Sequence, residues 1–229
     1  MAGTVSDYAR EREAMVERQI ESRGVSDPKI LDAFRTVPRE VFVGEDYAEL
    51  AYGDHPLPIE AGQTISQPYI VALMIEAAGI GPNDKVLEVG GGSGYASAVM
   101  SRIARKVIAI ERQHDLVELA RERLQALGYD NVRVVQGDGT RGCRDEAPFD
   151  AILAAASGSH VPQSLVDQLA EGGTIVMPVG DPGWVQKLVK GIKGPDGKLV
   201  TEDLGGVRFV PLIGEEGWDN GSNGNGEPA

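Results

Sequence analysis

The stretch Val86-Leu87-Glu88-Val89-Gly90-Gly91-Gly92-Ser93-Gly94-Tyr95 decides the fold of this 229-residue chain. It begins with strand-like residues, passes through a glycine turn and leads into a helical pattern over residues 96–104. Gly90, Gly92 and Gly94 let the backbone turn sharply and let a ligand approach it, while the following helix offers free N–H groups at its N-terminus. The stretch therefore predicts a strand, a loop and a helix that bind a nucleotide-like cofactor.

Two acidic residues indicate which cofactor this is. Glu111 closes the next strand and lies 21 residues after Gly90, near the spacing of about 20 at which a carboxylate accepts hydrogen bonds from ribose hydroxyls. The loop has the form G-x-G-x-G, whereas a dinucleotide loop has two residues between its last two glycines. The Glu88 carboxylate would attract a cofactor that carries a sulfonium cation and an amino group, which favours S-adenosyl-L-methionine. A tight turn without a ligand is the alternative interpretation.

Composition excludes several classes of function. The 22 basic and 35 acidic side chains leave a formal charge of −13, which opposes the phosphate backbone of a nucleic acid. A single cysteine, Cys143, excludes an intrachain disulfide, and no metal is expected because no cluster has the spacing of metal ligands. No stretch resembles a signal peptide or reaches the length of about 18 apolar residues that a membrane span needs. The sequence predicts a soluble, cytoplasmic protein without nucleic-acid or membrane partners.

Strand-like and helical segments alternate along most of the chain. Helices are expected at residues 113–127 and 162–170, and strands at residues 131–136, 149–154 and 173–179. Strands separated by helical lengths imply right-handed crossovers and a parallel sheet that helices cover on both faces. The predicted fold class is α/β, with a doubly wound, Rossmann-like sheet.

Both ends of the chain differ from this core. Residues 1–62 predict two helices and then an irregular segment rich in proline and glycine, residues 37–62, which we expect to cover the cofactor. The core itself spans residues 63–213 and ends in two strands around a turn, which are expected to pair antiparallel at the sheet edge. Residues 214–229 are acidic and nearly without apolar side chains, so a disordered tail is expected.

Three further residues are candidates for the site. Ser66 stands where an N-cap belongs, just before Pro68, so capping of the helix is one interpretation of its hydroxyl. Asp138 follows a strand and is placed either to accept the adenine amino group or to form an Asx turn. Cys143 has arginines nearby that would lower its pKa, but without a neighbouring histidine a nucleophilic role is disfavoured.

One set of motifs belongs together. It comprises Gln63-Thr64-Ile65-Ser66-Gln67-Pro68, Met15-Val16-Glu17-Arg18-Gln19-Ile20, Val37-Pro38-Arg39, Leu87-Glu88-Val89-Gly90, Gly137-Asp138-Gly139 and Val207-Arg208-Phe209-Val210-Pro211-Leu212. With these motifs the chain resembles the protein-L-isoaspartate (D-aspartate) O-methyltransferase family from Tyr8 to Gly214. Many methyltransferases share the glycine loop, whereas Thr-Ile-Ser ahead of a helix is this family's own mark.

The resemblance implies a class I methyltransferase fold whose last two strands are exchanged relative to other methyltransferases. It implies an enzyme that uses S-adenosyl-L-methionine to esterify the carboxylate of isoaspartyl residues in damaged proteins and peptides, which starts their repair. Ser66 matches the family's active-site serine and would orient the acceptor. The positions implied to border or contact the cofactor, beside the loop glycines, are Gln63, Thr64, Ile65, Glu88, Glu111, Asp138 and Gly139. Those implied to bind substrate are Ser66, Val210 and Pro211.

Departures from the family pattern leave different functions open. Gly91, Cys143 and residues 157–160 differ from the residues usual in the family, which allows a methyltransferase retuned to one particular peptide. A catalytically silent module that binds S-adenosyl-L-methionine is a second possibility, and a nicotinamide oxidoreductase is a third. The joint presence of Ser66, Glu88 and Glu111 argues against the silent module, and the short glycine loop argues against the oxidoreductase.

The tail contains three Asn-Gly pairs, Asn220-Gly221, Asn223-Gly224 and Asn225-Gly226. Glycine hinders attack of its N–H on the preceding side-chain amide very little, so deamidation to isoaspartate is expected there. Aged protein is therefore predicted to be methylated in this tail, either by another copy of the enzyme or within the same chain. The alternative is a solvating tail that ages without consequence.

Overall fold

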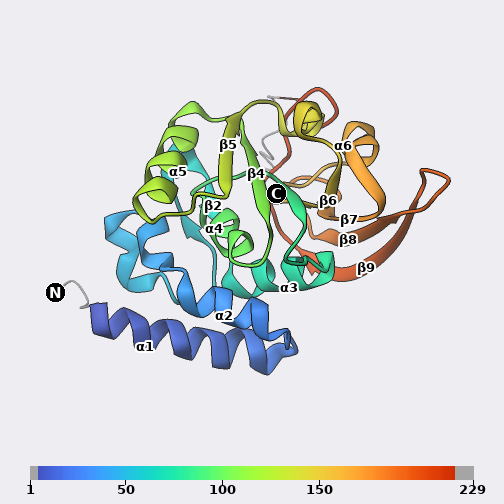
Figure 1. The fold of residues 1–229 in the computed structure, drawn as a ribbon. Helices are drawn as coiled ribbons and strands as arrows, with labels where there is room; N and C mark the ends of the chain where they lie inside the picture. Colours follow the sequence, from blue (N-terminus) through green and yellow to red (C-terminus); the bar gives the residue numbers. More distant parts are fainter. Residues whose placement is uncertain (1–4, 220–229) are drawn as a thin grey trace, which may run out of the picture.

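The computed structural model describes residues 5–219, so the three Asn-Gly pairs lie outside the described residues. A seven-stranded sheet in the order β5-β4-β3-β6-β7-β8-β9 forms its centre (Figure 1). The strands are β3 (Lys85–Val89), β4 (Lys106–Glu111), β5 (Val132–Gln136), β6 (Phe149–Ala154), β7 (Leu169–Val179), β8 (Gln186–Lys193) and β9 (Leu199–Val207). Neighbours from β5 to β7 pair parallel, and β8 and β9 pair antiparallel. The predicted sheet with antiparallel edge strands is confirmed.

Helices and short helical turns join these strands. The α-helices are α1 (Val5–Met15), α2 (Pro28–Thr36), α3 (Pro68–Ala78), α4 (Tyr95–Ser101), α5 (His114–Ala126) and α6 (Gln163–Gln168). A π-helical turn, η1 (Val16–Ile20), extends α1, and the 3-10 turns are η2 (Glu21–Arg23), η3 (Arg39–Phe42), η4 (Glu45–Leu50), η5 (Glu60–Gly62), η6 (Gly139–Arg141) and η7 (Arg144–Glu146). The second predicted core helix, expected over residues 162–170, is shorter than expected, because β7 already begins at Leu169.

The core lies in two layers, one on each face of the sheet. Val86 of β3 is aligned with Val107 and Ala151 of its neighbours, and all three are buried in the layer that contains side chains of α3, α4 and α5. Leu87, the next residue, points to the opposite layer, where Leu165 of α6 packs. Because β3 is central and covered on both faces, its residues Val86, Leu87 and Val89 are apolar and buried. The doubly wound architecture is thus confirmed.

The N-terminal residues attach to one side of this core. Figure 1 shows α1 and α2 together beneath the sheet, on the side of α3. Arg12 of α1 forms an ion pair of 3.1 Å with Glu40, and its Nε donates to the Tyr52 hydroxyl at 2.8 Å. The irregular segment then ends in a small antiparallel pair, in which β1 (Leu57–Pro58) lies beside β2 (Thr64–Ile65). The segment expected to be a cover is therefore tied to the first helix and leads directly into the Thr-Ile-Ser motif.

The structure differs from the expected disordered tail at residues 214–219, which are folded onto the core. The N–H of Glu215 donates to Asp138 Oδ2 at 2.8 Å, and the Glu216 carboxylate accepts the N–H of Ser164 at 3.0 Å. Trp218 donates its indole N–H to the Ser157 carbonyl at 2.8 Å. These polar contacts order a segment whose composition contains few apolar residues to bury.

Candidate active site

The glycine loop joins β3 to α4 at the carboxyl edge of the parallel strands. Its φ angles are +85° at Gly90, +51° at Gly92 and +88° at Gly94, a region that residues with a Cβ rarely occupy. The N–H groups of Gly90 and Gly91 donate to the Ile110 carbonyl at 2.9 and 3.2 Å, which holds the loop against the end of β4. The loop therefore presents backbone rather than side chains at the edge where ligands of such sheets bind.

A cavity with a volume of about 410 Å³ lies at this loop. Among the residues that line it are eight predicted site residues, namely Gln63, Thr64, Gly90, Gly92, Glu111, Gly139, Val210 and Pro211. Five other predicted residues lie outside its lining, namely Ile65, Ser66, Glu88, Gly94 and Asp138. The volume falls within the range of small-molecule sites, about 300 to 1,000 Å³. We call this space the cofactor cavity.

Glu111 is held in a fixed orientation at the wall of the cofactor cavity. One of its carboxylate oxygens accepts the N–H of Gly92 at 3.0 Å, and the other accepts the N–H of Gln113 at 2.9 Å. Only 8% of the residue is exposed. An ionised carboxylate has about four acceptor positions, so capacity remains for two hydroxyl donors of a ligand. These residues fit a cofactor that carries a ribose.

Glu88 is buried behind the loop rather than in the cofactor cavity. The Ser97 hydroxyl donates to its carboxyl group, and the side chain borders a separate cavity of about 30 Å³ together with Ser66 and Ala155. Burial raises the pKa of Glu88 to about 8, and the nearby Glu111 charge raises it further while the Ser97 hydrogen bond opposes the rise. In the protein without cofactor, Glu88 therefore carries a proton at neutral pH.

This proton makes stability depend on pH. Between the unfolded value of 4.5 and the folded value of about 8, the folded state binds one more proton than the unfolded state at Glu88, so stability falls as pH rises. We expect the free energy of unfolding to drop by about 1.4 kcal/mol more between pH 6 and pH 7 in the wild type than in Glu88→Gln. Urea unfolding of both proteins at the two pH values measures this difference, and equal slopes would contradict the assignment.

Asp138 adopts the Asx turn that was one of its two interpretations. Its Oδ1 accepts the Thr140 N–H at 2.9 Å and the Thr140 hydroxyl at 2.7 Å, and it caps η6. Burial alone would raise the pKa of Asp138, but these bonds and the N–H of Glu215 lower it below its ordinary value. Both carboxylate oxygens are therefore already engaged by the protein, and a contact with adenine stays a prediction.

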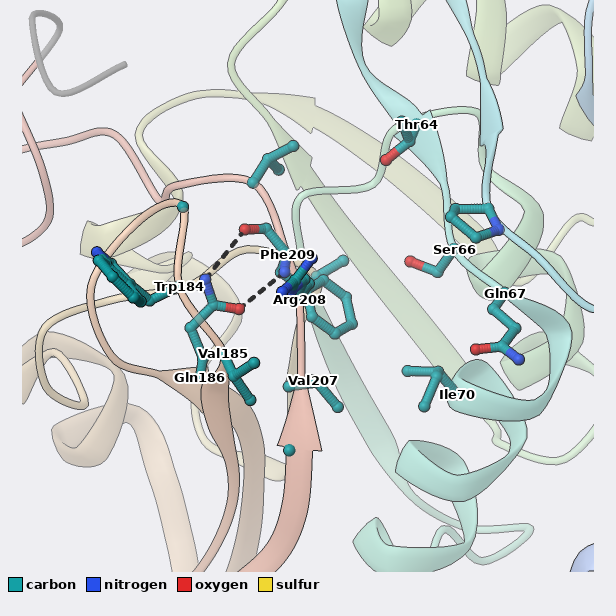
Figure 2. A pocket seen from close by; sticks show the side chains of 15 residues that line it. Thr64, Ser66, Gln67, Ile70, Trp184, Val185, Gln186, Val207, Arg208 and Phe209 are labelled. Atoms are coloured by element: carbon teal, nitrogen blue, oxygen red, sulfur yellow. Dashed lines mark hydrogen bonds between the residues drawn. The ribbon is translucent and has the colours of Figure 1, made fainter. Parts of the chain in front are cut away.

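A second cavity, with a volume of about 560 Å³, adjoins the first. Thr64, Ala155 and Val210 line both cavities and so form a shared wall. Figure 2 shows Thr64, Ser66, Gln67 and Ile70 on one side of the second cavity and Trp184, Val185 and Gln186 on the other, with Arg208 and Phe209 between them. Arg208 is the one charged residue in this lining within residues 5–219. We call this space the acceptor cavity.

The capping interpretation of Ser66 is wrong. Helix α3 begins at Pro68 with Gln67 as its N-cap, and no side chain caps it. Across the part of the chain that the structure describes, the Ser66 hydroxyl forms no hydrogen bond, and the residue lines the acceptor cavity instead. Its carbonyl accepts a hydrogen bond of 2.8 Å from the buried Arg39. The hydroxyl is thus available to a ligand.

Sequence reasoning missed several residues of the acceptor cavity, among them Gln186 and Trp184. Gln186 is 1% exposed, and its side chain accepts the Phe209 N–H at 2.8 Å and donates to the Phe209 carbonyl at 3.4 Å (dashed in Figure 2). Trp184 is 75% exposed at the rim. A tryptophan directly after the Asp-Pro-Gly turn is a signal that sequence reading could have used, whereas the bridge from Gln186 has no local signature.

Cys143 takes no part in either cavity. Burial raises the pKa of its thiol, with Glu146 adding to the rise, which is opposite to the lowering expected from neighbouring arginines. Among residues 5–219, no three His, Cys, Asp or Glu side chains gather as a possible metal site. No helix in that range has both the length and the apolar character needed to cross a membrane.

Two cavities with a shared wall can bring two ligands into contact. The cofactor cavity offers bare backbone and an oriented carboxylate, and the acceptor cavity offers a hydroxyl and a guanidinium. No pair of side chains in the described linings resembles a nucleophile activated by a neighbouring base, so the arrangement favours a reaction between the two ligands themselves. Group transfer between bound molecules is the chemistry that this geometry supports.

Comparisons with known proteins agree with this chemistry. The model of the family described as Protein-L-isoaspartate(D-aspartate) O-methyltransferase (PCMT) matches residues 10–217. A relative from Pelobacter propionicus, protein-L-isoaspartate O-methyltransferase 2, is 52% identical over 207 residues, which are 90% of this chain and 92% of the relative. The protein-L-isoaspartate O-methyltransferase of Methanoculleus marisnigri is 51% identical over 91% of this chain and 94% of its own length.

Solved structures give the same result. A protein-L-isoaspartate O-methyltransferase superimposes with a TM-score of 0.83 at 33% identity and covers 90% of this chain and 67% of its own. A Plasmodium falciparum protein described as a protein-L-isoaspartate O-methyltransferase in complex with S-adenosyl-L-homocysteine has a TM-score of 0.76 at 28% identity, over 88% of this chain and 98% of its own.

Proposed function

Because the chain belongs to the protein-L-isoaspartate (D-aspartate) O-methyltransferase family, we propose that its two adjoining cavities hold S-adenosyl-L-methionine and an isoaspartyl peptide. The protein is a methyltransferase that uses S-adenosyl-L-methionine to methylate isoaspartyl residues of damaged proteins, and so serves their repair. The observation that carries the placement is the shared wall of Thr64, Ala155 and Val210, where a ligand of one cavity meets a ligand of the other.

The reaction needs little acid–base chemistry from the protein. When bound, S-adenosyl-L-methionine supplies a methyl group, which an acceptor carboxylate oxygen takes as the carbon–sulfur bond breaks and its electron pair stays on sulfur. A carboxyl group with a pKa of about 4 is ionised at neutral pH, so no residue has to remove a proton from the acceptor. The chain's own contribution is to align the acceptor and to exclude water, which can supply several kcal/mol of the barrier.

Ser66 is the residue that we assign to the acceptor. Its hydroxyl faces the acceptor cavity without a protein partner in the described chain and lies one residue beyond β2, whose Thr64 belongs to the shared wall. A hydroxyl can donate to one oxygen of the acceptor carboxylate while the other oxygen stays free to react. Ser66 therefore orients the acceptor. Val210 lines both cavities and Pro211 lines the cofactor cavity, and these two residues complete the proposed substrate contact.

The cofactor side is assigned to the glycine loop and its neighbours. Glu111 accepts hydrogen bonds from the ribose hydroxyls, and Gly90, Gly92 and Gly94 shape the backbone against which the ligand lies. Gln63, Thr64 and Gly139 line this cavity. Ile65 and Asp138 lie outside its lining, next to Thr64 and Gly139, and would hold these two residues in place. Glu88 acts from behind the loop, where its charge state responds to a cationic ligand.

A direct assay tests the activity of this chain. We expect the protein to transfer label from S-adenosyl-L-methionine to an isoaspartyl peptide and to leave the matched aspartyl peptide unlabelled. The reason is that the free carboxylate of an isoaspartyl residue is the α-carboxylate, whereas that of an aspartyl residue is the side-chain carboxylate. Loss of the label as methanol in mild alkali identifies a methyl ester. Equal labelling of both peptides would support a retuned carboxyl methyltransferase, and binding of S-adenosyl-L-homocysteine without any labelling would support the silent module.

The proposal also covers the cellular compartment, the partners and the role of the N-terminal residues. We place the protein in the cytoplasm, which its single cysteine supports. The formal charge of −13 makes nucleic acid an unsuitable partner. We also propose residues 1–62 as an attachment that covers residues 63–213, which is supported by the contacts of Arg12 with Glu40 and Tyr52 and of Arg39 with Ser66.

A further inference from the structure

Arg39, at the start of η3, is a fully buried arginine whose guanidinium makes contacts in three directions. It is 0% exposed. Its Nε donates to the Ala51 carbonyl at 2.7 Å, and its Nη2 donates to the Ser66 carbonyl at 2.8 Å. The guanidinium carbon lies 4.7 Å from the centroid of the Tyr95 ring. Arg39 belongs to the Val37-Pro38-Arg39 motif.

The environment of this guanidinium is unfavourable for a structural cation. Within residues 5–219 no carboxylate forms an ion pair with Arg39, and burial lowers the pKa of the guanidinium. Its Nη1 has no hydrogen-bond partner in the described chain. A buried charge without a counter-ion destabilises a fold unless carbonyl dipoles and an aromatic face compensate it. An apolar residue would fill the same space without this cost.

Each contact of Arg39 belongs to a different part of the site. Ala51 lies in the segment that covers the core, and Ser66 lies in the loop that lines the acceptor cavity. Tyr95 is the first residue of α4, immediately after the glycine loop of the cofactor cavity. Arg39 therefore connects the two loops across which the methyl group must pass.

The tyrosine end of this connection is rigid. Tyr95 is 1% exposed and packs edge-on against Phe34 and Phe42, with ring centroids 6.2 and 5.7 Å away. A planar guanidinium that lies over such a ring has little freedom to rotate, and its fork fixes the directions of its N–H groups. Through Arg39, the Ser66 carbonyl is therefore held in a fixed position relative to α4, the helix that begins at the glycine loop.

We propose that Arg39 is a positioning residue that holds the Ser66 backbone in a fixed relation to the glycine loop, so that the Ser66 hydroxyl meets the acceptor in line with the bound cofactor. This inference rests on the role of Ser66 proposed above. An arginine suits this task because one planar group reaches two carbonyls and a ring together, whereas the single ammonium of a lysine cannot.

A double-mutant cycle between Arg39→Lys and Ser66→Ala tests the proposal. Because Arg39 acts through Ser66, we expect Arg39→Lys alone to lower kcat on an isoaspartyl peptide about 10-fold and to change the affinity for S-adenosyl-L-homocysteine less than about 2-fold. In the Ser66→Ala background the same substitution should change kcat less than about 2-fold. Arg12→Lys is the matched control, because Arg12 is a partly buried arginine that binds Glu40 and Tyr52 but not Ser66. It should act equally in both backgrounds.

Equal losses of kcat from Arg39→Lys in both backgrounds would overturn the proposal, since a merely structural arginine gives additive effects. An unchanged kcat in Ser66→Ala alone would instead refute the assignment of Ser66, so the two failures are distinguishable. If Arg39→Lys does not fold, as thermal unfolding will show, Tyr95→Leu replaces it in the cycle. That variant removes the ring under the guanidinium, and the same non-additive pattern is expected, while additive losses overturn the proposal.

Discussion

Ser66→Ala is expected to lower kcat on an isoaspartyl peptide about 100-fold, while the affinity for S-adenosyl-L-homocysteine stays within about 2-fold. The reason is that the hydroxyl faces the acceptor cavity and forms no hydrogen bond to the described protein. Its loss therefore affects a contact with the acceptor rather than with the cofactor or the fold. Steady-state kinetics and calorimetric titration on the same variant measure the two quantities.

Thermal unfolding of the same variant separates orientation from capping. An N-cap side chain contributes about 1 kcal/mol, whereas Ser66 caps no helix and its loss should leave stability nearly unchanged. Asp27→Ala is the matched control, because Asp27 does cap α2 by accepting the Lys29 N–H at 2.9 Å. That control should lose stability and keep its activity. A Ser66→Ala protein with full kcat would refute the assignment of Ser66 to the acceptor.

Glu111→Ala is expected to weaken binding of S-adenosyl-L-homocysteine about 100-fold, since two hydrogen bonds to a charged group are lost, each at the low end of their range, about 1.5 kcal/mol. The Gly92 N–H would also lose its partner, which loosens the glycine loop. At a ligand concentration about 100 times the wild-type Kd, ligand stabilisation should fall from about 2.7 kcal/mol to about 0.4 kcal/mol. Thermal unfolding with and without ligand measures this change.

Glu118→Ala supplies the control for that experiment. Glu118 lies on α5, which follows Glu111, and forms an exposed ion pair with Arg121 of the same helix. Glu118→Ala removes the same charge outside the lining, on the helix that directly follows the lining residue Gln113, so a purely long-range electrostatic effect on the ligand would appear in both variants. Ligand stabilisation that is equal in Glu111→Ala and in the wild type would exclude Glu111 from the ribose site. A rise in the unfolding temperature with NAD but not with S-adenosyl-L-homocysteine would contradict the assignment as a methyltransferase.

Much of the lining of the cofactor cavity could be predicted from the sequence because its signals are local. The strand, the glycine turn and the helix stand within one stretch, and Glu111 ends the next strand of a parallel sheet, which places it beside the loop. Local order and sheet topology together determine this half of the site.

Predictions that rested on one segment alone were less reliable. Ser66 has the type and position of an N-cap, yet Gln67 occupies that place and Arg39, 27 residues earlier, binds the Ser66 carbonyl. Asp138 is engaged by Glu215, 77 residues later. Residues 214–219 have the composition of a tail, but Trp218 and Glu216 find partners on the core. Such long-range pairs leave no local pattern.

The wall that the two cavities share also determines when the protein becomes able to bind its ligands. This wall consists of Thr64, Ala155 and Val210. Ala155 is placed by its N–H on the Val89 carbonyl at 2.8 Å, and the Val210 carbonyl is bound by the Ser157 N–H at 2.8 Å. Synthesis adds Val210 146 residues after Thr64, so a growing chain cannot close either cavity before Val210 has been made. Because a ligand stabilises only a state that binds it, we expect cofactor to stabilise the chain only once Val210 has joined Thr64 and Ala155.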